Sequence, residues 1–293
     1  MPASPFLDRL KAGKPLVLDG ATGTNLQARG LPAGSPSDLW VLDCPDEILR
    51  LHRDFLLAGS DIILTDTFGS SKLHLAHAGI ESRFEETNRA AVGLAKKAAG
   101  EFGALVGGSL GPLGEMLEPM GSLGVEAAEA EYAAQARLLV DGGVDLLVIE
   151  TQFDLNEASA ALRAVRAFTD LPVVVSFSYD RGTRSMMGVK PAQMAQALEG
   201  AGATALGINC GRSLEDNLKA LTELRAATSL PIWFKPNAGL PQTAPDGSTV
   251  FNVSPAAMGA AVPAWLAAGA ALVGGCCGTS PKHLAAIARA ARI

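Results

Sequence analysis

The sequence has few charged residues and no excess of basic ones. Charged residues make up 18% of the 293 positions, against 48% hydrophobic residues, and this balance argues against a disordered chain. The 24 basic and 30 acidic residues are interspersed and give a net charge of −6. This charge offers no electrostatic basis for binding nucleic acid or an anionic membrane, so we expect neither as a partner.

Long apolar runs and targeting signals are also missing. Residues 1–15, MPASPFLDRLKAGKP, lack the apolar centre of a signal peptide, and no uncharged apolar run reaches the roughly 20 residues that span a membrane. We therefore expect a cytoplasmic protein. Only four cysteines occur, and in a reducing compartment we expect no disulfide framework. Clustered cysteines there favour metal ligands or catalytic thiols.

Short apolar stretches alternate along the chain with segments of helical periodicity, such as 46–59 with its stripe of Ile48, Leu51 and Phe55. The stretches resemble strands buried on both faces. They cover 15–19, 61–65, 104–109, 145–150, 172–178, 204–209, 231–236 and 271–276. Eight strand–helix units predict an α/β protein, a (β/α)8 TIM barrel, in one domain spanning 1–293. A doubly wound open sheet is the alternative.

Three irregular stretches, 20–44, 110–123 and 237–253, each follow a predicted strand. In a barrel this places them on the face where active sites form.

Three of the cysteines lie where predicted strands end. Cys276 and Cys277 are adjacent in GGCCGT after the eighth strand, and Cys210 follows the sixth strand in GINCG. Both strand ends open onto the same rim of a barrel, so the three thiols can converge. Three thiolates suit zinc and leave one of its four positions open, as in catalytic sites. The alternatives are buried apolar cysteines or a strained Cys276–Cys277 disulfide; Cys44 has no such neighbour.

Polar residues end the other strands and outline a functional mouth. We expect Asp19 and Glu150 to act as the catalytic carboxylates, holding a substrate ammonium, although a capping role is the alternative. Backbone N–H groups from Gly20 to Thr24 can bind a carboxylate. The expected substrate-binding residues are Asp19, Gly20, Thr22, Thr67, Ser109, Glu150, Asn209 and Asn237.

The four histidines do not suggest a second metal site. His74 and His77 are three residues apart, but a helix surface facing solvent explains that spacing better than metal binding. We also expect His52 and His283 on helix surfaces. Lys235, at the end of the seventh strand, leaves open the alternative of a Schiff-base aldolase or lyase, which would give the thiols no role.

Several motifs, in this order along nearly the whole chain, resemble the homocysteine S-methyltransferase family. They resemble most the homocysteine-binding module of cobalamin-dependent methionine synthase, and betaine–homocysteine methyltransferase more distantly. GGCCGT and LGINC are highly specific, and DGATGT and PNAGLP reinforce them. The longer matching segments are LDGATGTNLQ, DIILTDTFGSSKL, GSLGPLGEMLEPMGSL, VIETQFDLNEA and VGGCCGTSPKHLAAIARA.

The resemblance implies a zinc-binding barrel enzyme, a methyltransferase that converts homocysteine to methionine. It implies that Cys210, Cys276 and Cys277 hold Zn²⁺, that the homocysteine sulfur takes the open position, and that Asp19 and Glu150 contact its amino-acid end. The methyl donor stays open between methylcobalamin, a sulfonium such as S-methylmethionine or S-adenosylmethionine, and a betaine-type ammonium. The alternative is a non-catalytic module that presents homocysteine to a separate corrinoid or folate methyl-donor protein.

Overall fold

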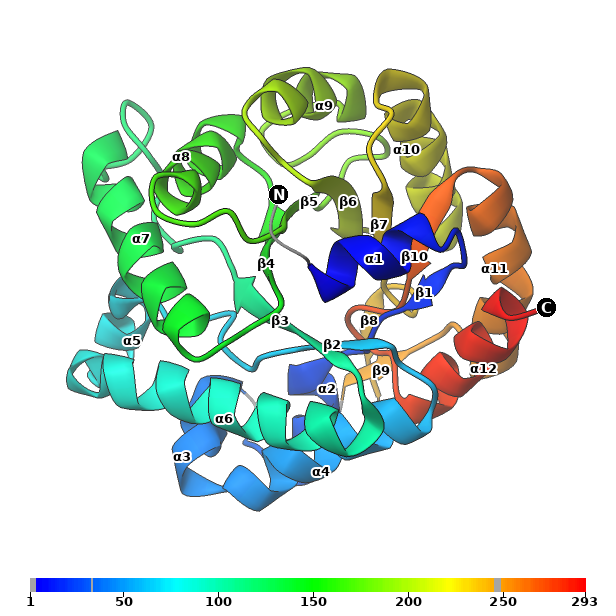
Figure 1. Cartoon of the computed structure of the whole chain (residues 1–293), viewed down its shortest axis with the longest axis horizontal. Helices are drawn as coiled ribbons and strands as arrows, with labels where there is room; N and C mark the ends of the chain where they lie inside the picture. Colours follow the sequence, from blue (N-terminus) through cyan, green and yellow to red (C-terminus); the bar gives the residue numbers. More distant parts are fainter. Residues whose placement is uncertain (1–3, 33, 245–248) are drawn as a thin grey trace.

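Eight parallel strands form the wall of a barrel, and helices surround it (Figure 1). The computed structural model describes residues 4–32, 34–244 and 249–293. The strands are β1 Leu16–Val17, β2 Ile62–Leu64, β3 Leu105–Leu110, β4 Leu146–Gln152, β5 Val173–Phe177, β6 Ala205–Cys210, β7 Ile232–Pro236 and β10 Ala270–Val273. Their order is β1-β10-β7-β6-β5-β4-β3-β2, and a parallel bridge from Leu18 to Ile62 joins the two ends. The predicted (β/α)8 barrel is confirmed, and the open sheet is not formed.

The helices lie in the segments before, between and after the strands. They are α1 Pro5–Lys11, α2 Thr22–Gln27, α3 Trp40–Asp43, α4 Pro45–Leu57, α5 Lys72–His77, α6 Phe84–Phe102, α7 Val125–Asp141, α8 Leu155–Arg166, α9 Pro191–Gly200, α10 Leu214–Ala227, α11 Pro255–Ala267 and α12 Pro281–Ala291. Proline occupies the first turn of α4, α9, α11 and α12, where its missing N–H costs no helical hydrogen bond. None of the helices in the described ranges is long and apolar enough to cross a membrane.

The barrel interior is apolar at one end and polar at the other. Alternate strand residues point inward, so Leu146 and Val148 of β4 join Trp233 of β7 in the interior core. Phe6 of α1 belongs to the same core, and α1 lies across the N-terminal end of the barrel (Figure 1). The same alternation continued toward the C-terminal ends brings Ser109, Glu150, Ser176, Asn209 and Lys235 to the inward face.

Two stretches expected to be irregular contain regular structure. Residues 20–44 form α2, a 3₁₀ turn at Ser37–Leu39 and α3, while residues 237–253 form an antiparallel pair, β8 Pro241–Thr243 and β9 Thr249–Phe251. Residue 33 and residues 245–248 of these stretches lie outside the described residues. Short polar strands such as PQT carry no apolar alternation, which is why sequence periodicity does not reveal them.

The expectation that His52 and His283 lie on helix surfaces is wrong. His52 is 2% exposed, because it follows Ile48 by four residues and so shares the face of α4 that packs inward. His283 is 8% exposed and lies at the beginning of α12, where its ring nitrogens contact the Ser280 backbone N at 3.1 Å and the Val253 carbonyl at 2.9 Å.

Candidate active site

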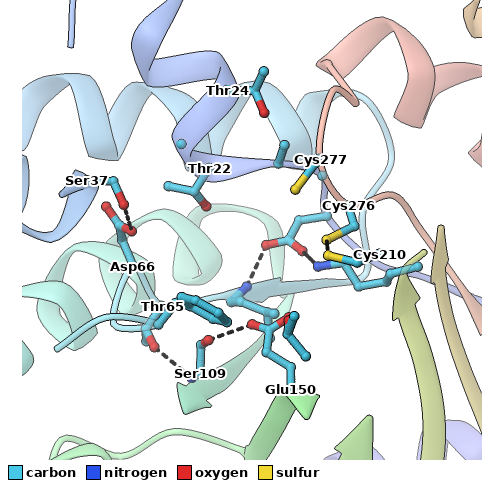
Figure 2. Close-up of a pocket in the computed structure, with 18 residues that line it drawn as sticks. Thr22, Thr24, Ser37, Thr65, Asp66, Ser109, Glu150, Cys210, Cys276 and Cys277 are labelled. Carbon is cyan, nitrogen blue, oxygen red and sulfur yellow. Dashed lines mark hydrogen bonds and ion pairs between the residues drawn. The ribbon is translucent and has the colours of Figure 1, made fainter. Parts of the chain in front are cut away.

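A cavity of about 360 Å³ lies at the C-terminal ends of the strands. Figure 2 shows three sulfur atoms together on one side of it, with Ser37 and Asp66 on the opposite side. The lining residues are Asp19, Gly20, Ala21, Thr22, Gly23, Thr24, Ser37, Leu64, Thr65, Asp66, Phe68, Ser109, Glu150, Thr151, Cys210, Lys235, Cys276 and Cys277.

The three cysteines converge as their positions on the strands predict. The sulfur atoms of Cys210, Cys276 and Cys277 all lie within 4.8 Å of one another, and those of Cys210 and Cys276 are 3.0 Å apart. Within the described ranges this is the one group of metal-ligating side chains brought together in this way. His77 instead lies at the surface, 3.5 Å from the Glu115 carboxylate.

The thiols share their protons unequally. Hydrogen bonds from Cys210 and then Cys276 lower the pKa of Cys277 to about 3, whereas hydrogen bonding with Cys276 and Cys277 raises the pKa of Cys210. One thiolate is therefore stabilised at the expense of its neighbours. A dication among the sulfurs would relieve this competition, because it favours the deprotonated form of each thiol.

The donor set fits zinc in kind and in spacing. Zn–S bonds of about 2.3 Å in a tetrahedral site place the sulfurs about 3.8 Å apart, and the separations here bracket that value within a range of 3.0 to 4.8 Å. Three thiolates leave a fourth position for a substrate atom, and Cys277 is exposed on the cavity side.

Two residues at the site, one of them a cysteine of the cluster, have a left-handed backbone conformation. Cys210 and Thr151 both have φ of 60°, which is uncommon outside glycine and an outlier for β-branched threonine. Asn209 holds Thr151, because its Oδ1 accepts from the Thr151 N–H at 2.9 Å and its Nδ2 donates to the Thr151 hydroxyl at 2.7 Å. The same Nδ2 lies 3.7 and 3.8 Å from the sulfurs of Cys210 and Cys276. Asn209 thus links the ends of β4 and β6 to the thiol cluster.

The segment carrying Cys276 is anchored through its backbone. The Cys276 N–H donates to the Pro236 carbonyl at 2.9 Å, and the Cys276 carbonyl accepts from the Thr279 hydroxyl at 2.7 Å. A Cβ atom at Gly275 would come within 2.5 Å of the Thr279 side chain, so only glycine permits this close approach. The glycines of GGCCGT therefore serve the packing of the loop that presents the thiols.

Glu150 lies in the cavity wall, with one hydrogen bond to its side chain from the residues that the structure describes. Its Oε1 accepts from the Ser109 hydroxyl at 2.6 Å. Burial raises the pKa of Glu150 to about 7, although attraction to Lys235 opposes the shift. A carboxyl poised near neutrality can hold a substrate ammonium when ionised.

Asp19, the other expected carboxylate, is occupied by the protein. Its Oδ1 lies 2.6 Å from the Lys235 ammonium and its Oδ2 accepts from the Leu64 N–H at 2.7 Å. Burial alone would lower the pKa of Lys235, but attraction to Asp19 and Glu150 raises it to about 12. A Schiff-base lysine must be neutral to react, so this ion pair disfavours the aldolase alternative.

The other expected substrate-binding residues divide into two groups. Gly20, Thr22 and Ser109 line the cavity, as do Asp19 and Glu150. Thr67, Asn209 and Asn237 do not line it and instead hold neighbouring backbone. The Thr67 hydroxyl donates to the Ser109 carbonyl at 2.7 Å, and the Asn237 amide to the Gly211 carbonyl at 2.9 Å.

One wall of the cavity is formed by residues that were not among the expected substrate-binding residues. Asp66 is 2% exposed, its Oδ1 accepts from the Ser37 hydroxyl at 2.8 Å, and burial raises its pKa well above the usual range. Ser37 comes from a 3₁₀ turn in a stretch with no regular pattern, so nothing in the sequence places it here. Asn217, whose amide donates to the Cys210 carbonyl at 2.7 Å, was missed because it lies on α10, away from the strand ends.

Comparison with known proteins agrees with this geometry. Methionine synthase from Mycobacterium tuberculosis is 30% identical over 94% of this chain, and that from Mycobacterium leprae is 30% identical over 95%. The chain spans 24% of the length of each. The metallated crystal structure of the homocysteine methyltransferase MmuM from Escherichia coli superposes with a TM-score of 0.83 at 29% identity, covering 97% of this chain and 99% of MmuM. The family model for homocysteine S-methyltransferase matches residues 16–291, and the chain belongs to that family.

Proposed function

We propose that the chain binds Zn²⁺ through Cys210, Cys276 and Cys277 and methylates the thiol of homocysteine to give methionine. The observation that carries this proposal is the convergence of three sulfur atoms within 4.8 Å at the wall of a cavity. The metallated form named for the E. coli relative supports metal binding in this chain.

The chemistry starts from the proton on the substrate thiol. A free thiol has a pKa of about 8.5 and is mostly protonated at neutral pH, whereas the thiolate is the nucleophile. Zinc at the three cysteines would supply the charge that keeps the substrate sulfur deprotonated. The homocysteine sulfur then forms a bond to the methyl carbon while the bond from that carbon to the donor breaks, with both groups in line.

The remaining residues bind and orient the substrate. Ionised Glu150 holds the ammonium of homocysteine. The Ser109 hydroxyl donates a hydrogen bond of 2.6 Å to the Glu150 carboxylate and so fixes its position. Gly20 and Thr22 form the adjoining wall. Asn209 positions the backbone of Thr151 and lies beside the sulfurs of Cys210 and Cys276. Asp19 positions the ammonium of Lys235. The buried walls limit water at the reacting atoms.

A second candidate function is a module that presents homocysteine to a separate corrinoid or folate donor protein. The observation that favours it is that the chain spans only 24% of the mycobacterial methionine synthases. Incubating the zinc-loaded protein with homocysteine and each donor in turn separates the two. Methionine formed from S-methylmethionine, S-adenosylmethionine or betaine supports a complete enzyme, whereas turnover only with methylcobalamin or a corrinoid protein supports the module.

Substitution of the thiols tests the shared part of both candidates. We expect Cys210→Ala, Cys276→Ala and Cys277→Ala each to lose zinc and methionine formation together, because each removes one of three ligands. Cys44→Ala is the matched control and should retain both, since Cys44 is not part of the cluster. Measurement of zinc content beside turnover decides the matter, and an active, metal-free variant would refute the mechanism.

A further inference from the structure

Lys235 is the one positively charged side chain that lines the cavity within the described part of the chain. It follows Trp233 by two residues on β7 and so points into the barrel, where its side chain is 4% exposed. The other ionisable groups of the lining are carboxyls and thiols. Apart from a metal ion at the cysteines, Lys235 is therefore the one cation that a negatively charged part of a substrate can meet among the described lining residues.

The ammonium of Lys235 has unused hydrogen-bonding capacity. It carries three N–H donors, and among the described residues its one acceptor is Asp19 Oδ1, at 2.6 Å. Asp19 holds the ammonium in place, and its other oxygen is taken by the Leu64 N–H. The remaining N–H groups are available to a ligand.

Lys235 also lies beside the group that would hold a substrate ammonium. Glu150 and Lys235 both line the same cavity, and both are inward-facing residues near the C-terminal ends of their strands. An α-amino acid carries its ammonium and carboxylate on the same carbon atom. An acidic and a basic side chain in one cavity suit such a ligand, and Glu150 and Lys235 provide them.

We propose that Lys235 binds the α-carboxylate of homocysteine while Asp19 anchors the lysine and Glu150 binds the ammonium; this rests on the function proposed above. Selection for thiols that carry an α-carboxylate follows from the assignment. The backbone N–H groups near Gly20 are less suited to this role, because the Ala21 N–H already donates to Thr279 and α2 has only six residues.

The test compares two thiols that differ only in the carboxylate, L-homocysteine and 3-aminopropane-1-thiol. Cobalt(II) in place of zinc reports thiol binding by its visible absorption, independently of turnover. Lys235→Met removes the charge, and the double variant Asp19→Asn, Lys235→Met removes the ion pair without leaving a buried carboxylate unpaired. Lys219→Met, which removes an exposed lysine charge that does not line the cavity, is the matched control.

We expect the dissociation constant of homocysteine to rise roughly tenfold to a hundredfold in both Lys235 variants, the effect of one charge-assisted hydrogen bond, and that of 3-aminopropane-1-thiol to stay within about twofold. Cobalt content should match the wild type. Equal losses for both thiols, or no loss for homocysteine, would overturn the assignment of Lys235. A wild-type protein that takes up no metal and binds neither thiol would overturn the proposed function, and the assignment with it.

Discussion

Glu150 carries a stability cost that depends on pH and can be measured without substrate. Burial raises its pKa from the ordinary 4.5 to about 7, against the attraction of Lys235. Between these two values the folded protein binds more protons than the unfolded chain, so stability falls as pH rises through this window. The shift corresponds to a destabilisation of the folded protein by about 3 kcal/mol. This destabilisation is absent below the lower pKa and fully present above the higher one.

Glu150→Gln removes this cost, because the amide cannot ionise and its oxygen can still accept from the Ser109 hydroxyl. The metal-free variant should be more stable than the wild type by about 3 kcal/mol near pH 8, with the difference vanishing toward pH 4.5. Urea denaturation followed by circular dichroism, in the presence of a chelator and over this pH range, gives the difference directly.

Glu215→Gln is the control for loss of one negative charge. Glu215 is exposed and paired with Lys219, so this variant should stay within about 0.5 kcal/mol of the wild type at every pH. A Glu150→Gln variant that is destabilised near neutral pH, or whose advantage does not change with pH, would refute this account of the site. Glu150→Gln should also bind homocysteine more weakly than the wild type, so its stability and its substrate affinity are expected to change in opposite directions.

Two further predictions concern residues behind the cavity wall. Asn209→Ala should destabilise the protein by about 2–3 kcal/mol in urea denaturation, because the Thr151 N–H loses its acceptor. The same substitution should lower the affinity for zinc, measured by competition with a chromophoric chelator. An unchanged zinc affinity would exclude the positioning role of Asn209. Burial lowers the pKa of His52 to about 4, so protonation of His52 should contribute a loss of about 3 kcal/mol as pH falls from 6.5 to 4, opposite in sign to the contribution of Glu150. His52→Leu should lack this loss in acid titration, whereas parallel curves for the two proteins would count against a buried neutral histidine.

The fold and the thiol cluster could be predicted from the sequence because both depend on strand periodicity. Apolar stretches locate the strands, and the ends of parallel strands share one rim, so Cys210 and Cys276 had to lie near each other once the barrel closed. Inward alternation likewise brings Glu150 into the cavity. Strand positions, strand ends and the alternation of side chains are properties of the backbone, and the pattern of apolar residues in the sequence predicts them.

Side-chain pairing inside the barrel could not be predicted in the same way. Asp19 and Lys235 are 216 residues apart and meet only because β1 and β7 both border β10. Asn209 looks like a substrate-binding residue by position, yet its amide is consumed by Thr151 and Ser176. Which polar group faces the cavity and which faces a neighbour depends on rotamers and hydrogen-bond partners that the sequence does not encode locally.

Asp19 connects the stability of the barrel to the chemistry of the site. β1 has only two residues and meets β2 through a single bridge, so the seam between them is short of backbone pairing. The Oδ2 of Asp19 accepts from the Leu64 N–H there, and takes the place of a ladder hydrogen bond. Its Oδ1 holds Lys235 in the cavity. One carboxylate thus adds a hydrogen bond to the seam of the barrel and fixes the only cationic side chain described in the lining, so a change at Asp19 alters closure and substrate binding together.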